Sequence, residues 1–380
     1  MSSLDARLGA LRGTAPPVPH NARTLAALTA NPSCERRLVI DAAGVDKDAL
    51  AAHLGHGRPL QKSPLALDYG LAFERKVTSR GGTPLVPLLR EALGLTLSEV
   101  AYADVNSVGS DHDTSPLRIR HARTRHLVLS AARRKSEPRT LLDHPVLRLT
   151  VAGHSVYLEP DVIAFQHNGN FHIVEIKSFP VIHGQPDPAK VAAALTQAAA
   201  YVLALRELLQ DDGLPPQRVS DTVVLVNPRN FSHHPTATPH NARTQIRNLS
   251  RHLGRLHRLP ELLDRLPPHT TFDLAPGPDK TPTRPRGDLA ADLATTRPHY
   301  TPGCRHHCDL AFHCRTEARN QGRVEALGTA VGEDLAGIDT IATALALVDG
   351  HLHPSRDHKD ITQALRHADR IHADLRTGRA

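Results

Sequence analysis

The stretch HSVYLEPDVIAFQHNGNFHIVEIKSF, residues 154–179, decides the fold. Apolar and β-branched residues dominate 154–165 and again 170–179, and this pattern predicts two strands. Residues 167–170, His-Asn-Gly-Asn, join them, and Asn-Gly is a strong signal for a tight hairpin turn. We therefore expect an antiparallel hairpin at the centre of the sheet.

Helices and further strands are expected before the hairpin. Ser63 followed by Pro64 is typical of a helix start, because a hydroxyl caps the first turn and proline fits its first position. That helix is predicted to run to about residue 79 and to end at Gly81-Gly82. A second helix is expected over 84–94, a polar loop over 104–116, and strands over 123–133 and 146–152.

After the hairpin, Asp187 and Pro188 again combine a cap with a first-turn proline. They open an Ala-rich helix that is predicted to reach Gln210, and a strand follows over 222–226. The order of helix, three strands, helix and strand predicts a mixed α/β core. A basic amphipathic helix is expected over about 241–265, and two or three helices over 316–376.

These patterns divide the chain into five regions. They are an N-terminal helical segment (1–62), an α/β core (63–230), a basic helix with a Pro/His-rich linker (231–300), a cysteine cluster (301–316) and C-terminal helices (317–380).

The hairpin carries a group of charged residues that points to metal chemistry. Asp161 lies in its first strand, and Glu175 and Lys177 lie two apart in its second, so they project to one face. The turn brings Asp161 near Glu175. Convergent carboxylates suit Mg²⁺, and a lysine beside them can orient water or offset developing phosphate charge.

The alternative is that these charged residues only form a solvated face of a strand, as is often the case. However, lysine is rare in this chain, and Ile173, Val174 and Ile176 predict a buried strand, where unpaired charges would be unfavourable.

The two flanking helices add polar residues to this group. Glu74, four residues after Gly70, could supply a further carboxylate from the first helix. Gln197 and Tyr201 are spaced i, i+4, so both lie on one face of the Ala-rich helix. An amide and a phenol there could bind phosphate or position the lysine.

Together these residues resemble the PD-(D/E)XK nuclease superfamily and its RecB-like branch. The matching positions are Gly70, Glu74, Pro160-Asp161, Glu175-x-Lys177 and Gln197-x3-Tyr201, and the resemblance covers about residues 64–227. It implies a restriction-endonuclease-like αβββαβ core that hydrolyses DNA with Mg²⁺ or Mn²⁺. It also implies that Asp161, Glu175 and the carbonyl of Ile176 ligate the metal, with Glu74 supporting the metal or its water. By the same resemblance Lys177 positions the nucleophilic water, and Gln197 and Tyr201 contact substrate or the lysine.

The four cysteines, Cys34, Cys304, Cys308 and Cys314, are a second candidate site. Three of them fall within eleven positions, and thiolates are soft ligands that suit zinc or an iron–sulfur cluster. One cysteine before the core and three after it is similar to the RecB-like CRISPR-associated exonucleases and the AddB-type subunits. That resemblance implies a structural [4Fe–4S] cluster. The family usually has two residues between the first two C-terminal cysteines, and this chain has three. Zinc is therefore the alternative, with His306, His307 or His313 as further ligands.

Composition limits the partners that can be expected. Lys and Arg number 46 against 39 Asp and Glu, so the net charge of +7 favours a polyanion, although an arginine-rich composition alone could produce it. Trp is absent and aromatics are few, which argues against a surface built on stacked bases. The most apolar segment, Val191–Leu205, is interrupted by Thr196 and Gln197 and is shorter than a membrane span. We expect a cytoplasmic protein without a membrane partner.

The resemblance therefore implies a DNA nuclease that is single-strand or end-directed and acts in repair or anti-phage defence. No Gly-x4-Gly-Lys-Ser/Thr motif occurs, so helicase action would need a partner from the same system. Two alternatives are an inactive DNA-binding or scaffold module that keeps the nuclease fold, and a zinc-binding regulator.

Overall fold

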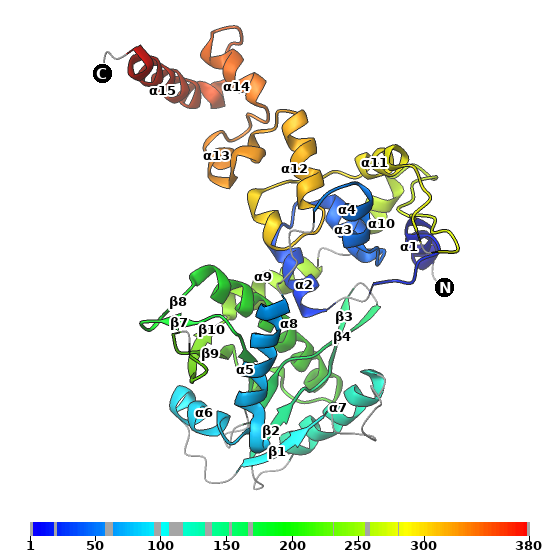
Figure 1. Ribbon diagram of the computed structural model, residues 1–380, viewed down its shortest axis with the longest axis vertical. Coiled ribbons are helices and arrows are strands. Elements are labelled where there is room, and N and C mark those ends of the chain that lie inside the picture. Colours follow the sequence, from blue (N-terminus) through cyan, green and yellow to red (C-terminus); the bar gives the residue numbers. More distant parts are fainter. Residues whose placement is uncertain are drawn as a thin grey trace. The chain divides into compact units, whose positions relative to one another are not determined.

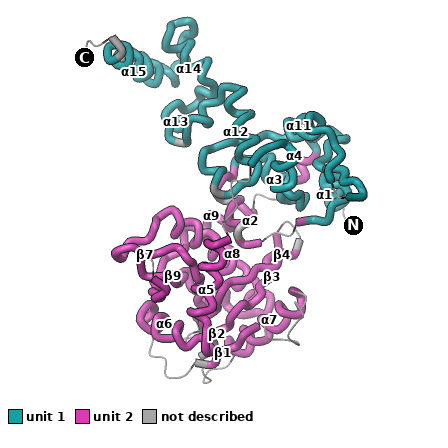
Figure 2. The backbone as a smooth tube through the Cα atoms, in the orientation of Figure 1, with its two compact units in different colours: residues 1–17, 33–61, 264–380 teal, residues 18–32, 62–263 magenta. Residues whose placement is uncertain are grey.

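The computed structural model divides the protein into two compact units, shown in Figure 2. Unit 1 comprises residues 1–17, 33–61 and 264–380, and unit 2 comprises 18–32 and 62–263. The structure describes residues 3–18, 21–57, 64–94, 100–105, 117–133, 139–151, 154–165, 170–230, 232–254, 259–279 and 281–377. Cys34 and the C-terminal cysteines fall in unit 1, whereas the hairpin and its charged residues fall in unit 2.

A six-stranded mixed sheet forms the centre of unit 2 (Figure 1). Its order is β1-β2-β5-β6-β9-β10. The pairs β1–β2 and β6–β9 are parallel, and the pairs β2–β5, β5–β6 and β9–β10 are antiparallel. The strands are β1 (Val100–Asp104), β2 (Arg139–Asp143), β5 (Val162–Phe165), β6 (Phe171–Ile176), β9 (Thr222–Pro228) and β10 (Pro235–Asn241). The predicted mixed α/β class is confirmed.

The expected hairpin is present as β5 and β6, with Val162 opposite Val174. Its turn, at 166–169, lies outside the described residues. The predicted strand over 154–165 is wrong as a single element. Its first half, β4 (His154–Leu158), pairs instead with β3 (Leu147–Val151) in a separate two-stranded sheet. Pro160, which has no N–H to donate to a ladder, separates the two halves and places Asp161 just before β5.

Three other predictions need correction. Residues 123–133 belong to a helix, α7 (Leu117–Arg133), whose buried Thr124, Val128 and Ala132 recur at the helical spacing of four. Strand β1 begins before the predicted polar loop and includes its first residue, and residues 106–116 of that loop lie outside the described part. Strand β10 was not expected, because Pro235 and Pro239 suggest a loop. Prolines are tolerated there since β10 is an edge strand.

Helices cover both faces of the sheet. α5 (Pro64–Gly82) leaves helical geometry at Ser79–Gly81, as expected, and α6 (Leu85–Leu93) follows. Phe73, Val77, Leu85 and Leu89 pack with one set of alternate strand residues, including Val174 and Ile176. Glu175 lies between these two in the sequence and therefore points to the other face, which α8 (Pro188–Asp211) covers. Asp187 caps α8, accepting hydrogen bonds from the amides of Ala189 and Lys190, as predicted.

α8 is the one helix in the described part of the chain that is long and apolar enough to cross a membrane. Half of its apolar window is buried, and it packs against β3, α2 (Ala22–Ala30) and α9 (Arg243–Gly254). The core position of α8 in unit 2 accounts for its apolar composition. The predicted helix over 241–265 is represented by two helices, α9 and α10 (Leu259–Asp264); the residues between them are outside the described part.

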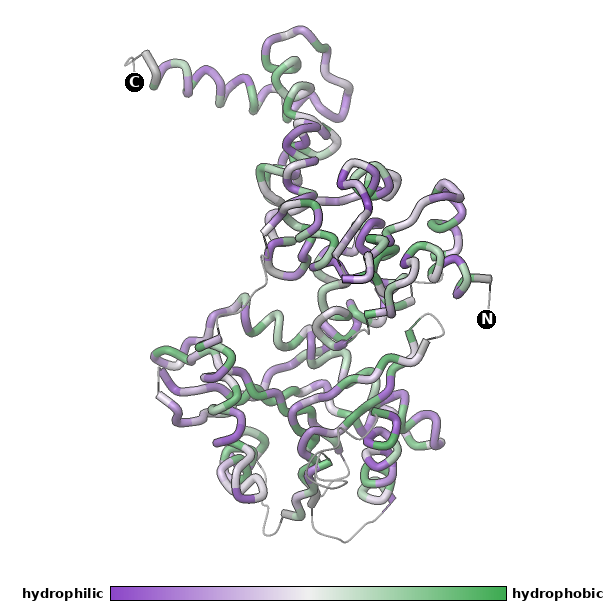
Figure 3. The backbone as a smooth tube through the Cα atoms, turned by 45° about the vertical axis from the view of Figure 1, so that its right-hand side comes forward, coloured by the Kyte–Doolittle hydropathy of each residue, from purple (hydrophilic) through white to green (hydrophobic). Residues whose placement is uncertain are grey.

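Unit 1 is mainly helical. Its N-terminal helices are α1 (Ser3–Arg12), α3 (Glu35–Ala42) and α4 (Lys47–His53). Its later helices are α11 (Arg286–Ala294), α12 (Ala311–Asn320), α13 (Thr329–Asp334), α14 (Ile341–Val348) and α15 (Lys359–Thr377). A small cluster of Val324, Leu335, Ile338 and Leu347 holds the last helices together. Along α15 hydrophobic and hydrophilic residues alternate, as expected for an amphipathic helix (Figure 3).

Candidate active site and cysteine cluster

Glu175 and Lys177 lie at the C-terminal end of β6 and form an ion pair. Glu175 is fully buried, and its Oε1 accepts a hydrogen bond from the Nζ of Lys177. Its second oxygen, Oε2, is also buried and has no hydrogen-bond partner among the described residues. A buried carboxylate oxygen without a donor is unfavourable unless something else binds it. This oxygen is therefore a candidate ligand atom.

The hairpin brings Asp161 to the same place. With Val162 opposite Val174, the register carries Asp161 to the position opposite Glu175. The Oδ2 of Asp161 accepts a hydrogen bond from the backbone N–H of Ile176 at 2.5 Å. The three residues predicted from the sequence thus meet at one end of the β5–β6 pair. The ligand role of the Ile176 carbonyl stays a prediction.

Burial and mutual charge shift the pKa of each group in this site. Burial, and then the charge of Glu175, raises the pKa of Asp161 well above its usual value. Burial also raises the pKa of Glu175, although Lys177 opposes the change. Burial alone would lower the pKa of Lys177, but Glu175 and Asp161 outweigh it, so the net shift is upward and the ammonium form is favoured.

Glu74 lies on α5 beside this group. Its charge contributes to the raised pKa values of Asp161 and Glu175, after burial. At Gly70, α5 comes close to the residues that follow β6. A Cβ atom added at this glycine would lie 3.5 Å from the Oγ of Ser178. The Oε1 of Glu74 is 3.0 Å from the Nε2 of His144, so its nearest partner is a histidine that the sequence did not single out.

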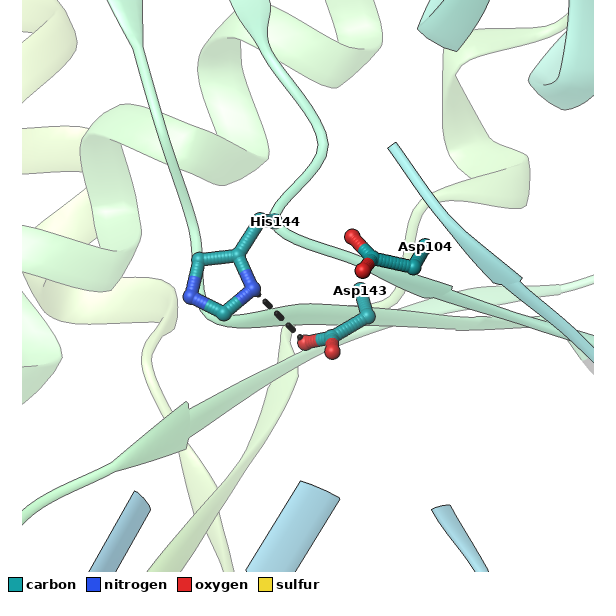
Figure 4. Close-up of side chains that lie close together, drawn as sticks. All are labelled: Asp104, Asp143 and His144. Atoms are coloured by element: carbon teal, nitrogen blue, oxygen red, sulfur yellow. Dashed lines mark ion pairs between the residues drawn. The ribbon is translucent and has the colours of Figure 1, made fainter. Parts of the chain in front are cut away.

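His144 is part of a chain of contacts that reaches from β1 to α5. Its Nδ1 is 3.1 Å from the Oδ1 of Asp143, and the Oδ2 of Asp143 accepts a hydrogen bond from the hydroxyl of Tyr102 (Figure 4 shows Asp143 and His144). The hydrogen bonds to Asp143 and Glu74 raise the pKa of His144 to about 10. Tyr102, Asp143, His144 and Glu74 form what we call the β1–α5 chain.

The backbone of His144 is equally constrained. Its φ of 48° lies in the left-handed region, which non-glycine residues seldom adopt, and its N–H donates to the carbonyl of Asp161 at 2.9 Å. His144 therefore contacts Glu74 through its ring and the Asp161 segment through its backbone. A residue held in this way is suited to fixing two site residues relative to each other.

Among the described residues, Asp104, Asp143 and His144 form a group that could bind a metal ion, because their ligand atoms lie within 4.8 Å of one another (Figure 4). Such spacing could hold an ion. Both ring nitrogens of His144 already face carboxylates, however, so a metal ion there would have to displace one of these contacts. We therefore treat these residues as a hydrogen-bonded network that supports Glu74.

Gln197 and Tyr201 lie on α8, on the face of the sheet to which Glu175 points. The Nε2 of Gln197 donates to the hydroxyl of Tyr201 at 2.8 Å. Burial, and then the charge of Glu175, raises the pKa of Tyr201 well above its usual value. The phenol therefore stays protonated near the carboxylates. No described hydrogen bond joins either side chain to Lys177, so a role for them in positioning the lysine stays a prediction.

The four cysteines converge within unit 1 as unpaired thiols. Cys304, Cys308 and Cys314 are buried, and Cys34 is half-buried. The charge of Cys304 raises the pKa of Cys34, and the charges of Cys308 and Cys34 raise the pKa of Cys314. Burial is the main effect, and it raises the pKa of Cys308 to about 11 and that of Cys314 to about 12. Thiols in such surroundings stay protonated unless a metal binds them.

Several donors nevertheless point at these sulfur atoms. The backbone N–H groups of His299 and Arg37 favour the thiolate of Cys34, and the N–H of Thr301 lies 3.5 Å from the Sγ of Cys304. The guanidinium of Arg36 is almost fully buried and donates to the Sγ of Cys314 at 3.3 Å. Arg36 also pairs with Glu317. N–H groups and a buried cation around sulfur suit a site that carries negative charge.

Sequence reasoning found Glu74 but missed Tyr102, Asp143 and His144 of the β1–α5 chain, and it missed Arg36. Asp143 and His144 directly precede Pro145 at the end of β2, where nothing in the local pattern separates them from an ordinary turn. Arg36 follows Cys34 by two residues, and that proximity is the one signal that could have indicated it. No family profile matches the chain, and no curated protein matches it either.

Proposed function

We propose that unit 2 is a metal-dependent nuclease of the PD-(D/E)XK type that hydrolyses phosphodiester bonds of DNA. The observation that carries this proposal is the meeting of Asp161, Glu175 and Lys177 at the end of β5–β6, with a buried, unpartnered oxygen on Glu175. Carboxylates that converge beside a lysine suit cation-assisted chemistry on a phosphate.

The order and direction of the strands support the proposal. The family core implied by the resemblance runs helix, three strands, helix, strand. In unit 2 the elements α5, β2, β5, β6, α8 and β9 occur in that order along the chain, with α6, β1, α7 and the β3–β4 pair between them. The sequence did not predict β2, and the strand it predicted over 146–152 is β3, which lies outside the six-stranded sheet. Strands β2, β5 and β6 are successively antiparallel neighbours, and β9 is parallel to β6. In this view β1, β10 and the β3–β4 pair are additions to the core.

The donor set fits Mg²⁺ or Mn²⁺. Asp161 and Glu175 offer hard carboxylate oxygens, the Ile176 carbonyl could add a third, and Glu74 stands beside them. When bound, the cation would polarise the phosphate and lower the pKa of a water. The protonated Lys177 would orient the attacking water and face the charge that develops on the phosphate. Tyr201, kept protonated, can donate its hydroxyl to a phosphate oxygen.

A cleavage assay tests the proposal. Purified protein is incubated with Mg²⁺ or Mn²⁺ and with single-stranded, linear double-stranded or circular DNA, and RNA of the same sequence serves as a comparison. We expect metal-dependent cleavage of DNA that the Asp161→Asn change abolishes and that Asp211→Asn, an exposed change on α8, leaves intact. Equal cleavage by both variants, or none by the wild type, would favour an inactive DNA-binding scaffold. A preference for single strands or ends would support the expected role beside a helicase in repair or defence.

We further propose that the cysteines of unit 1 hold a structural [4Fe–4S] cluster. The buried thiols and the donors around them fit an anionic thiolate site. Tetrahedral zinc with bonds of about 2.3 Å would hold its sulfur ligands less than about 4 Å apart. Among the described residues the cysteines are not a group of three ligand atoms that lie within 4.8 Å of one another. The preference for the cluster over zinc rests on the resemblance of the four cysteine positions.

The β1–α5 chain yields a prediction for the nuclease site. The change His144→Ala should lower the cleavage rate by about 10- to 100-fold, the range usual for residues that orient metal ligands. The half-saturating Mn²⁺ concentration should rise as well, because Glu74 loses its nearest partner. His126→Ala on the exposed face of α7 is the control and should behave as wild type. Unchanged metal dependence in His144→Ala would show that the histidine does not act on the site.

A further inference from the structure

One long segment of unit 2 contains arginines but no acidic residue. Between Asp221 and Glu261 there is no acidic residue, and residues 222–260 contain six arginines. The segment therefore carries a net charge of +6. An arginine-rich composition would spread arginines along the chain, where acidic residues balance them. A run of 39 residues without an acidic side chain departs from that balance, as does the run 114–136, which has seven cations and no acidic residue.

The described part of the segment consists mainly of β9, the edge strand β10 and α9, and its four described arginines are on the outside. Arg229, Arg243, Arg247 and Arg251 are exposed. α9 is held by its apolar side, where Ile246 and Leu249 are buried and the helix packs against α2 and α8 (Figure 1). Because the apolar side of α9 is packed, the helix cannot turn, and its polar side stays exposed to solvent.

Three of the arginines form a row along this surface. Arg243, Arg247 and Arg251 are spaced i, i+4 and i+8, so they lie on one side of α9 about 6 Å apart along its axis. Arg243 pairs with Asp221 at 2.9 Å. Arg247 and Arg251 have no ion-pair or hydrogen-bond partner among the described residues, so their guanidinium groups are available to a ligand. A row of free cations at regular spacing fits a partner with regularly spaced anions.

Arg229 connects this row with the candidate active site. In the β6–β9 pair, Val226 lies opposite Ile176, which is the residue between Glu175 and Lys177. Arg229 follows Val226 by three residues and lies just after the end of β9. It therefore lies toward the end of the sheet where the site is. β10 then runs back along β9, with Pro235 opposite Pro228 and Asn241 opposite Thr222, and leads to Arg243. The exposed arginines thus lie at the two ends of the β9–β10 pair, with Arg229 at the site end and the row on α9 at the other end.

We infer that Arg229, Arg243, Arg247 and Arg251 form a binding surface for the phosphate backbone of a nucleic acid, which holds the strand whose end enters the active site. We call these four residues the arginine track. That this nucleic acid is the substrate of the active site rests on the proposed function. Recognition here is independent of base sequence, because guanidinium groups bind phosphates and the segment has a single aromatic residue, Phe231, for stacking.

The salt dependence of DNA binding tests this inference. Binding of a fluorescent single-stranded oligonucleotide is measured without divalent metal, so that no cleavage occurs, over a series of salt concentrations. In the double variant Arg247→Gln/Arg251→Gln, the slope of log affinity against log salt should fall by about 1.4, since two phosphate contacts are lost. The affinity at low salt should fall about tenfold. The matched control is Arg356→Gln/Arg370→Gln, which removes the same charge from exposed sites in unit 1.

The outcomes separate this inference from the nuclease proposal. A reduced slope in the α9 variant and an unchanged slope in the control support the arginine track. An equal slope in wild type and in the α9 variant overturns it, even if the protein cleaves DNA. Tighter binding to phosphatidylserine vesicles than to DNA, with the same dependence on Arg247 and Arg251, also overturns it. A protein that binds DNA through the track but does not cleave it refutes the nuclease and leaves the track standing.

Discussion

Replacing Lys177 with methionine should reduce the rate of DNA cleavage by about 100- to 10,000-fold, the range for losing a group that orients water or stabilises transition-state charge. Methionine keeps most of the volume of lysine and removes only its ammonium group. The expected loss is in the turnover rate, with little change in KM. Initial rates on labelled linear DNA at saturating Mg²⁺ measure it.

The Lys177 variant also needs a test of folding, because Glu175 is fully buried and loses its ion-pair partner. Breaking a buried pair is destabilising when the remaining charge stays ionised. The pKa of Glu175 is already raised by burial, so the carboxyl can take up a proton instead. We expect a folded protein by circular dichroism. Lys190→Met, at an exposed ion pair in the first turn of α8, is the control, and a Lys177 variant as active as this control would refute the role of Lys177.

The second large effect is expected from Cys308→Ser. A serine oxygen is a poor replacement for a thiolate, so the variant should lose the cluster and with it the brown colour and the iron content of protein purified without oxygen. Structural metal sites can contribute on the order of 10 kcal/mol to folding, so unit 1 should melt far below the wild type. Iron and zinc analysis beside a thermal melt measures both effects.

His313→Gln is the matched variant for the cysteine site. His313 is buried beside Glu317 and would be a ligand only in the zinc alternative. With four cysteine ligands, His313→Gln should keep the iron and the colour of the wild type. A colourless wild-type protein that contains one zinc, which is lost in both variants, would contradict the cluster and support the zinc site.

Much of unit 2 could be predicted because its signals are local. The Asp187-Pro188 cap fixes the start of α8, and the glycines at 81 and 82 mark the end of α5. The Asn-Gly turn with two apolar strands gives the hairpin, and a hairpin determines which residues face each other. The meeting of Asp161 with Glu175 follows from that register alone. For this reason the centre of the site could be predicted without coordinates.

What could not be predicted depends on contacts between distant segments. The His144–Glu74 contact joins β2 to α5, and the sequence near either residue gives no sign of it. α7 was expected to be a strand because three consecutive apolar residues, 127–129, suit either element. β10 contains two prolines that only an edge position allows, and sheet order is a tertiary property. The free side of α9 likewise becomes clear only once its buried side is known.

Binding of Mn²⁺, followed by electron paramagnetic resonance, tests the central claim most directly, because it needs no substrate. We predict one Mn²⁺ ion bound to unit 2 of the wild type, and loss of that binding in the double variant Asp161→Asn/Glu175→Gln. The affinity should rise with pH, because burial raises the pKa of both carboxyls and the metal must displace their protons. Equal Mn²⁺ binding by wild type and double variant would contradict the assignment of this site.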